Sequence, residues 1–187
     1  MKKKKKIKPV YLVLFAIFLV YLSVQVESKA SSLKNEYPKP YHSVVREMSE
    51  KYNVDENLIY AIMRQESKYK SDAVSKADAR GLLQITEPTF DWLKMKMNDS
   101  ETVYDDLFDP SINIRYGAYF LSLLRNEFEQ TATQLAGYNA GLNITKTWLS
   151  DDQYSKDGKS LLVIPYPETK TYVKIVLENY KIYEEIY

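Results

Sequence analysis

The sequence predicts a mainly helical (mainly α) single domain with a possible small hairpin in one loop, preceded by one N-terminal apolar helix. Three observations support this. Apolar residues recur every three or four positions through most of the chain after residue 41, which is the period of amphipathic helices. The alternation of apolar and polar residues that is typical of strands does not extend over any useful length. At 187 residues the chain is long enough for one domain with a core and too short for two.

The N-terminal apolar segment predicts a membrane-spanning helix. Residues 10–26 carry no charge, and at about 1.5 Å per residue they are just long enough to cross a hydrocarbon core. The lysine-rich residues 1–9 would stay in the cytoplasm, which places everything after residue 26 outside. The alternative is a cleaved signal peptide, with Ser28 and Ala30 near the cleavage site, although charged neighbours make that site a poor one. Both interpretations place the domain outside the cytoplasmic membrane.

The rest of the chain divides into a linker and one domain. Residues 27–40 are polar and end in two prolines, which predicts a linker, and 41–187 form the domain. In the domain we expect a first helix from residue 41, then helices over 58–66, 82–97 (interrupted at Pro88), 112–128, 133–138 and 169–187, with loops at 67–80, 98–111 and 150–160.

Composition and charge exclude several classes of protein. The chain has no Cys and one His, so a disulfide framework, a thiolate nucleophile and a Cys-based metal site are excluded, and His42 has no neighbour at ligand spacing. We therefore expect neither a metal nor a cofactor. The formal net charge of +1 averages two regions, because residues 1–28 hold six lysines. The remainder has 20 basic and 24 acidic residues, about −4, which argues against a nucleic-acid partner.

The most informative residue is a glutamate on an apolar helix stripe. Asp55 is a good N-cap for the helix that follows. Ile59, Ile62 and Met63 fall at i, i+3 and i+4, and Glu66 falls at i+7 on the same face. A carboxyl group held at the interior or at a cleft wall has a raised pKa and can act as a general acid. The alternative is that Glu66 closes the helix from a half-exposed flank.

Three other segments carry polar residues beside glycine or proline. In 80–89, Gly81 permits close approach of the backbone, and Gln84 offers a donor and an acceptor among apolar neighbours. In 137–141, Tyr138 and Asn139 lie between glycines and alanine, a pattern that also fits a simple helix stop. In 164–173, Pro167 and Glu168 suit the first turn of a helix, which explains them without any function.

Taken in this order, the four segments resemble the lytic transglycosylases of the soluble lytic transglycosylase (SLT) domain family. The family pattern is Glu-Ser, Gly-Leu-Met-Gln, Ala-Tyr-Asn-Ala-Gly and Glu-Thr-Arg-x-Tyr-Val, and the stretch 109–117 is similar to the family's approach to its central helix. The resemblance covers about 41–183 and implies an α+β lysozyme-like fold. The chain departs from the pattern at Asp78, Leu83, Gly137 and Lys170.

The resemblance implies an enzyme that acts on peptidoglycan glycan strands and cleaves the β-1,4 bond from N-acetylmuramic acid to N-acetylglucosamine, leaving a 1,6-anhydro sugar. Glu66 would be the catalytic residue, first as acid and then as base. It also implies substrate contacts for a further set of residues, with Glu168 bracing the cleft: Ser67, Gln84, Ile85, Phe120, Tyr138, Asn139, Glu168 and Tyr172. The partners would be peptidoglycan, the cytoplasmic membrane through residues 10–26, and cell-wall machinery of unknown identity.

Three other functions stay open at this point. A lysozyme-type muramidase would release reducing ends and would need a positioned water, for which loop residues Asp72 and Asp78 offer possible second carboxylates. A catalytically retired glycan-binding module is disfavoured by the presence of Glu66. A helical membrane-associated interaction protein is disfavoured because the polar residues cluster in glycine-flanked segments and are not spread over one helix face.

Overall fold

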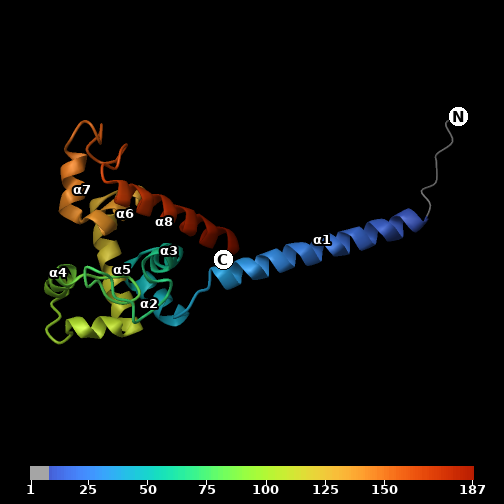
Figure 1. The fold of residues 1–187 in the computed structure, drawn as a ribbon, viewed down its shortest axis with the longest axis horizontal. Coiled ribbons are helices and arrows are strands. Elements are labelled where there is room, and N and C mark those ends of the chain that lie inside the picture. The colour runs from blue at the N-terminus through green and yellow to red at the C-terminus, as the bar shows by residue number, and fades with distance from the viewer. Residues whose placement is uncertain (1–8) are drawn as a thin grey trace. The chain divides into compact units, whose positions relative to one another are not determined.

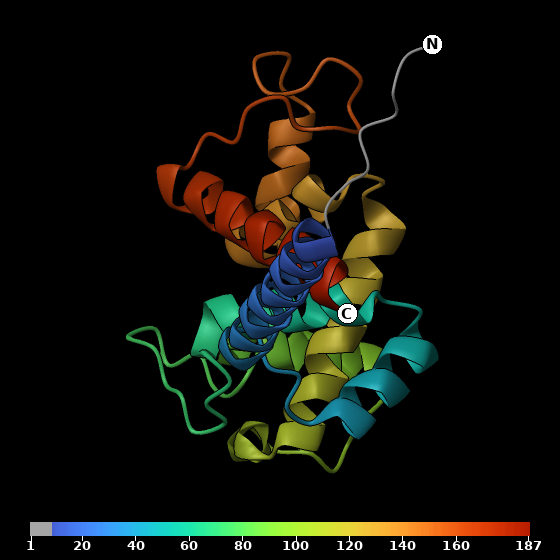
Figure 2. The same ribbon diagram turned by 90° about the vertical axis from the view of Figure 1, so that its right-hand side faces the viewer.

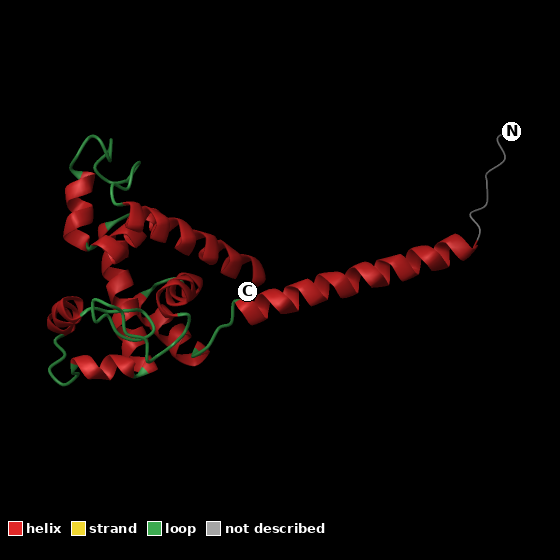
Figure 3. Ribbon diagram, viewed as in Figure 1, coloured by secondary structure: helices red, strands yellow, loops and turns green. Residues whose placement is uncertain are grey.

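The computed structural model describes residues 9–187, apart from the side chains of residues 9, 11–13, 16, 26 and 30. The described chain consists of helices and loops, and no strand is drawn in it (Figure 3). It falls into two compact units, one built from the chain up to Pro38 and the other from Lys39–Glu185.

The first unit contains α1 (Pro9–Glu36). Among the described residues, no helix combines the length and the apolar character needed to cross a membrane. The described part of the chain does not support the predicted span at 10–26, and residues 1–8 lie outside it. Residues 27–36 of the predicted linker at 27–40 are helical, because α1 continues to Glu36. Lys, Ala, Leu and Glu favour helix, and the first proline after them is Pro38.

The second unit is the helical domain. Figure 1 shows its helices and the long loop that joins α7 to α8. The elements are α2 (His42–Tyr52), α3 (Glu56–Ser67), α4 (Glu87–Met97), the 3-10 helix η1 (Tyr104–Phe108), α5 (Pro110–Glu127), α6 (Thr131–Ala140), α7 (Leu142–Leu149) and α8 (Pro167–Ile186).

Helix starts follow the sequence signals closely. The Asp55 carboxylate accepts hydrogen bonds from the first backbone N–H groups of α3, the shorter one 2.7 Å from Asn57. The Asp109 carboxylate caps α5 in the same way, at 2.8 Å from the N–H of Ser111. Pro110 and Pro167 occupy the first turns of α5 and α8, where a missing N–H costs nothing. The predicted starts of these helices are therefore correct to within two residues.

The start of one predicted helix is wrong, and one helix was not predicted. The expected helix over 82–97 begins only at Glu87, because Gly81 and Gln84 adopt left-handed φ values of 75° and 48° and turn the chain. The sequence also gave no indication of α7, because Gly141 signals a stop; with φ of 100° it ends α6 and lets the next helix start at once. The possible hairpin reduces, among the described residues, to isolated bridges that Arg80 makes with Val74 and Ile85.

Helix α5 is the centre of the domain. It contacts α2, α4, η1 and α6, and Figure 2 shows it running through the middle of the domain. Its residues Ile114, Tyr116, Ala118 and Leu124 are fully buried, as the period of apolar residues predicts.

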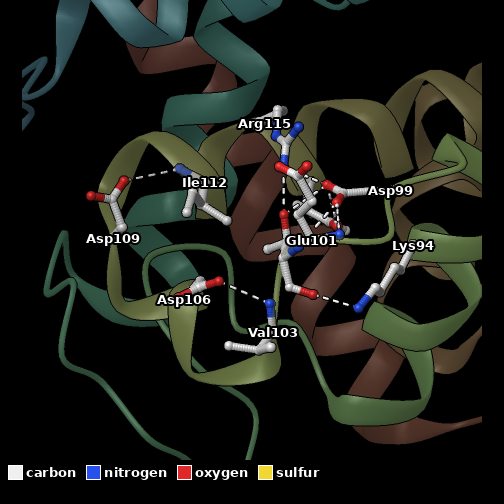
Figure 4. Close-up of polar contacts among 10 residues, drawn as sticks. Lys94, Asp99, Glu101, Val103, Asp106, Asp109, Ile112 and Arg115 are labelled. Carbon is white, nitrogen blue, oxygen red and sulfur yellow. Dashed lines mark hydrogen bonds and ion pairs between the residues drawn. The ribbon is translucent and has the colours of Figure 1, made fainter.

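The turn after α4 is organised around Asp99 (Figure 4). Its carboxylate accepts hydrogen bonds from the backbone N–H of Glu101 and from both the N–H and the hydroxyl of Thr102, the last at 2.7 Å. Arg115 Nη2 and the Tyr116 hydroxyl, both on α5, donate to it at 2.7 and 2.9 Å. Hydrogen bonds from Thr102 hold the pKa of Asp99 well below its usual range. The network fastens the turn to the central helix.

Candidate active site

Glu66 lies near the C-terminal end of α3 and lines a cavity of about 340 Å³. Ile59, Ile62 and Met63 on the same stripe are fully buried, so the period that placed Glu66 on the inward face is confirmed. Burial raises the pKa of the Glu66 carboxyl to about 7, and the hydroxyl of Tyr172 opposes that shift. Near neutral pH a large fraction of this carboxyl group is therefore protonated and able to donate a proton.

The cavity brings together residues from four helices and the loop that follows α3. Among its lining residues, Glu66 is the one carboxylic acid. In the described part of the chain, no three His, Asp or Glu side chains form a metal-binding group. The lining consists of Glu66, Ser75, Ala79, Gln84, Ile85, Thr86, Thr89, Phe120, Tyr138, Asn139, Ala140 and Gly141.

Leu83, the buried residue before Gln84, is held by contacts to two other helices. Its backbone N–H donates to Asn113 Oδ1 of α5 at 2.8 Å, and its carbonyl accepts from the Tyr138 hydroxyl of α6 at 2.7 Å. Its side chain packs onto Gly117, where an added Cβ would lie 2.1 Å from Leu83 Cδ1. Both backbone groups and the side chain of Leu83 are thus held, which fixes the position of the following residue, Gln84.

Close packing around Gly81, two residues before Leu83, also fixes the backbone that leads to Gln84. Asn113 Nδ2 donates to the carbonyls of Arg80 at 3.0 Å and Leu107 at 2.8 Å. A Cβ on Gly81 would lie 2.1 Å from that nitrogen and 2.2 Å from the Leu107 oxygen. Only glycine fits here, as the sequence suggested from the need for close approach.

Gln84 presents an acceptor to the cavity. Its Nε2 donates to the carbonyls of Ala73 at 3.1 Å and Gly81 at 2.8 Å, which uses both of its hydrogens. Its Oε1 is left to accept. From the sequence we expected Gln84 to offer both a donor and an acceptor. The structure leaves only the acceptor, because the left-handed backbone turns the amide nitrogen onto its own loop.

Aromatic and apolar side chains complete the wall. The rings of Phe120 and Tyr138 lie 5.1 Å apart between centroids, and Ile85 beside them is 2% exposed. Burial, with a further contribution from Glu66, raises the pKa of Tyr138 well above its ordinary value, so its hydroxyl stays protonated and donates to Leu83. The structure thus brings these three residues, proposed from the sequence, next to Glu66.

A second cavity, of about 420 Å³, shares Asn139 with the Glu66 cavity. It is lined by Glu168 and Tyr172 of α8 together with Gln65. The Tyr172 hydroxyl is buried with no described hydrogen-bond partner of good geometry; burial and the neighbouring Glu66 raise its pKa. Glu168 is exposed, and its bracing role stays a prediction.

Ser67 is not among the residues that line these cavities. It is 7% exposed, and its hydroxyl donates back to the Met63 carbonyl at 3.2 Å, one helical turn earlier. Ser75, which the sequence analysis did not propose, lines the Glu66 cavity instead. It lies in a polar loop without periodicity, so no sequence signal separated it from its neighbours. Asp78 is absent from the lining and pairs with Arg80 at 3.0 Å.

A larger cavity of about 680 Å³ continues from the Glu66 cavity. The two share Thr89, Phe120, Ala140 and Gly141, and the larger one extends between α4, α5 and α7 past Trp92. Together they form a groove with an aromatic wall, which suits an elongated ligand better than a small compact one.

Comparison with known proteins matches most of the helical domain to one family. The family model described as Transglycosylase SLT domain matches residues 43–161. The chain is 38% identical over 123 residues to "Membrane-bound lytic murein transglycosylase C" of Yersinia enterocolitica, which covers 60% of this chain and 34% of that protein. It is 34% identical over 128 residues to the protein of the same name from Mannheimia succiniciproducens, covering 63% and 36%. The chain thus spans about a third of the length of these relatives.

Solved structures agree with the sequence relatives. The chain is similar to an inactive mutant of the lytic transglycosylase Slt from Pseudomonas aeruginosa, with a TM-score of 0.71 and 29% identity, covering 82% of this chain and 25% of that one. It is also similar to the 70 kDa soluble lytic transglycosylase of Escherichia coli, with a TM-score of 0.73 and 27% identity over the same shares. The expected lysozyme-like fold, as found in these proteins, is confirmed.

Proposed function

This chain belongs to the transglycosylase SLT domain family, and from that premise we propose that it is a peptidoglycan lytic transglycosylase. Its substrate would be the glycan strand, cut at the β-1,4 bond from N-acetylmuramic acid to N-acetylglucosamine. The product would carry a 1,6-anhydro ring on the muramyl residue. The names of the relatives and of the solved structures support this activity.

The mechanism uses Glu66 twice. In its protonated form it gives its proton to the glycosidic oxygen as the bond from C1 breaks, which releases the N-acetylglucosamine side as an alcohol. The resulting carboxylate takes the proton of the muramyl 6-hydroxyl, whose oxygen closes onto C1. Glu66 is then protonated again and ready for the next cycle. Water takes no part, and the products together have the same atoms as the substrate.

The observation that carries this proposal is that Glu66 is the one carboxylic acid lining the cavity, with its pKa raised by burial to about 7. A glycosidase that hydrolyses through two carboxyl groups holds them about 5 to 9.5 Å apart across the bond. Asp72 and Asp78, the possible second carboxylates, are absent from the lining of the cavity. A mechanism in which one carboxyl group acts first as acid and then as base fits the lining of this cavity better than a muramidase mechanism with two carboxyl groups.

The groove beyond Glu66 supports a polymeric substrate. The larger cavity continues from the catalytic one and brings Trp92, with Phe120 packed edge-to-face at 5.9 Å, to its wall. Aromatic faces and amide groups are suited to the apolar faces and hydroxyl groups of sugar rings. Several consecutive sugars can therefore be held on this side of the cleaved bond.

The deciding experiment is mass spectrometry of the muropeptides that the purified full-length chain releases from peptidoglycan. Products with a 1,6-anhydromuramyl end, lighter by one water than reducing-end products, are expected. Reducing ends would replace the proposal by a muramidase, and no product from a folded chain would favour a glycan-binding module. Glu66→Gln keeps the shape of the side chain but cannot donate a proton, so product release should fall by about 100-fold or more.

We also propose that the domain works outside the cytoplasmic membrane and is held there through residues 10–26. The word "membrane-bound" in the names of the relatives supports a membrane association. The test is the intact mass of the protein recovered from the membrane fraction of producing cells, with protease added to spheroplasts. A full-length mass and digestion from outside are expected; a mass that begins near residue 30 would mean a cleaved signal peptide.

A further inference from the structure

Asn139 lines two of the cavities, the one that holds Glu66 and the one that holds Glu168 and Tyr172. Its Oδ1 accepts a hydrogen bond of 2.7 Å from the hydroxyl of Thr169 on α8. Its Nδ2 donates to no described protein group. The amide of Asn139 is thus fixed with its oxygen toward α8, and its N–H donors are left for a ligand.

Thr169 lies in the first turn of α8, where the helix offers its hydroxyl no carbonyl one turn earlier. Thr171, two residues further on, has one and donates to the Pro167 carbonyl at 2.8 Å. The Thr169 hydroxyl instead bonds across to α6, and the side chain is only 2% exposed. A buried hydroxyl needs a partner, and here the partner is a residue of the cleft 30 positions away.

We propose that Thr169 is a positioning residue: it holds the Asn139 amide so that the cleft presents N–H donors to an acceptor oxygen of the substrate beside Glu66. The inference rests on the proposed function. Without the hydroxyl, the amide can turn by half a rotation and present an acceptor in place of a donor. Gln84 gives the opposite case, since its own loop uses both of its N–H groups and leaves it an acceptor. The cavity therefore has one amide fixed as a donor and one as an acceptor.

The first test compares Thr169→Val and Thr169→Ser with the wild type, all as full chains acting on peptidoglycan. Thr169→Val keeps the shape and loses the hydroxyl; we expect kcat/KM to fall about ten-fold, the usual effect of one lost hydrogen bond. Thr169→Ser keeps the hydroxyl and should retain most of the activity. Thr145→Val is the matched control, because Thr145 is fully buried with an unpartnered hydroxyl outside the cleft, and it should leave activity unchanged.

The second test separates positioning from packing through a double-mutant cycle. In an Asn139→Ala background there is no amide to hold, so adding Thr169→Val should cause no further loss of kcat/KM. An equal ten-fold loss in both backgrounds, or wild-type activity for Thr169→Val alone, would overturn the proposal. If Thr169→Val does not fold, Thr169→Ala completes the same cycle.

The outcome of the cycle is distinguishable from a failure of the proposed function. A wild-type chain that releases no anhydro product counts against the function and not against Thr169. The same four chains are then compared by their dissociation constants for tri-N-acetylchitotriose, where the same non-additive pattern is expected. Additive effects on binding would overturn the role of Thr169 in that case as well.

Discussion

The hydroxyl of Tyr138 donates a hydrogen bond of 2.7 Å to the carbonyl oxygen of Leu83, 55 residues earlier in the chain. Tyr138 belongs to the segment 137–141 and Leu83 to the segment 80–89, so the bond joins two of the motifs that the sequence analysis singled out. Asn113 of α5 holds the N–H of Leu83 from the other side, at 2.8 Å. The motifs are therefore parts of one hydrogen-bonded unit behind the cavity.

Tyr138→Phe removes the hydroxyl and keeps the ring, so it tests the contribution of the hydroxyl alone. The Leu83 carbonyl loses its partner, so we expect about 1 kcal/mol of lost stability and about a ten-fold fall in kcat/KM as the loop carrying Gln84 loosens. Thermal unfolding and initial rates measure the two effects. Tyr119→Phe is the control, because its exposed hydroxyl makes only a 3.4 Å contact with the Lys96 carbonyl. Equal rates for Tyr138→Phe and the wild type would show that the ring alone suffices.

The rate should depend on pH through Glu66. Because the acid must be protonated in the free enzyme, kcat/KM should be level below pH 7 and fall about ten-fold per unit above the pKa of about 7. Initial rates from pH 5 to 9 at constant ionic strength measure this. A rate that stays level up to pH 9 would contradict a role for protonated Glu66 as the proton donor.

Glu66→Gln should make the protein more stable at neutral pH. The folded-state pKa of about 7 lies above the ordinary value of 4.5, so the folded state disfavours the carboxylate that the unfolded chain readily forms. The destabilisation begins above pH 4.5 and is complete above pH 7, where it amounts to about 3 kcal/mol. Thermal unfolding of both proteins should coincide at pH 4 and diverge as the pH rises. A constant difference from pH 4 to 8 would mean that ionisation of Glu66 does not contribute.

Gly81 and Gly158 allow backbone strain to be separated from steric overlap. Both have left-handed φ values, of 75° and 68°. A Cβ on Gly81 would overlap Asn113 and Leu107, whereas one on Gly158 has its nearest neighbour at 4.0 Å. Gly158→Ala should therefore cost about 1 kcal/mol from strain alone, and Gly81→Ala roughly 3 kcal/mol or more. Chemical denaturation of both variants measures the difference, and equal losses would refute the overlap.

Asp99→Asn should loosen the turn that follows α4. It removes the negative charge to which Arg115 and Thr102 donate hydrogen bonds, and we expect the free energy of unfolding to fall by roughly 2 kcal/mol at pH 7. The pKa of Asp99 is lowered from its usual 3.8, so the stabilisation is present above that value and is lost as the pH falls below it. The two unfolding curves should therefore converge in acid. Asp91→Asn, on the exposed face of α4, is the control and should match the wild type.

The sequence predicted the helices whose ends carry strong local signals. Asp55 and Asp109 cap α3 and α5 because their carboxylates reach the first N–H groups, a contact that depends on two or three neighbouring residues only. The inward direction of Glu66 follows from the helical period alone. These features depend only on residues that are close together in the sequence, so they can be predicted from the sequence alone.

The features that the sequence did not predict depend on distant partners. The left-handed turn at Gln84 exists because Asn113 and Tyr138 hold the preceding residue, and neither lies near it in the sequence. Thr169 was overlooked beside Glu168 for the same reason, since its hydrogen bond goes to Asn139 on another helix. Ser75 reaches the cavity through the path of a loop, which no periodicity encodes.

The arrangement around Leu83 has a consequence for how such a domain changes over time. Three stretches of sequence meet at Leu83, so a replacement in any of them must be accommodated by the other two. Substitutions at positions 83, 113, 117 and 138 should therefore covary in descendants of this chain. The lengths of the segments between those positions are under no such constraint. Extra residues around the exposed Lys156 would leave the cluster untouched, whereas a single residue inserted between Gly81 and Gln84 would break its register.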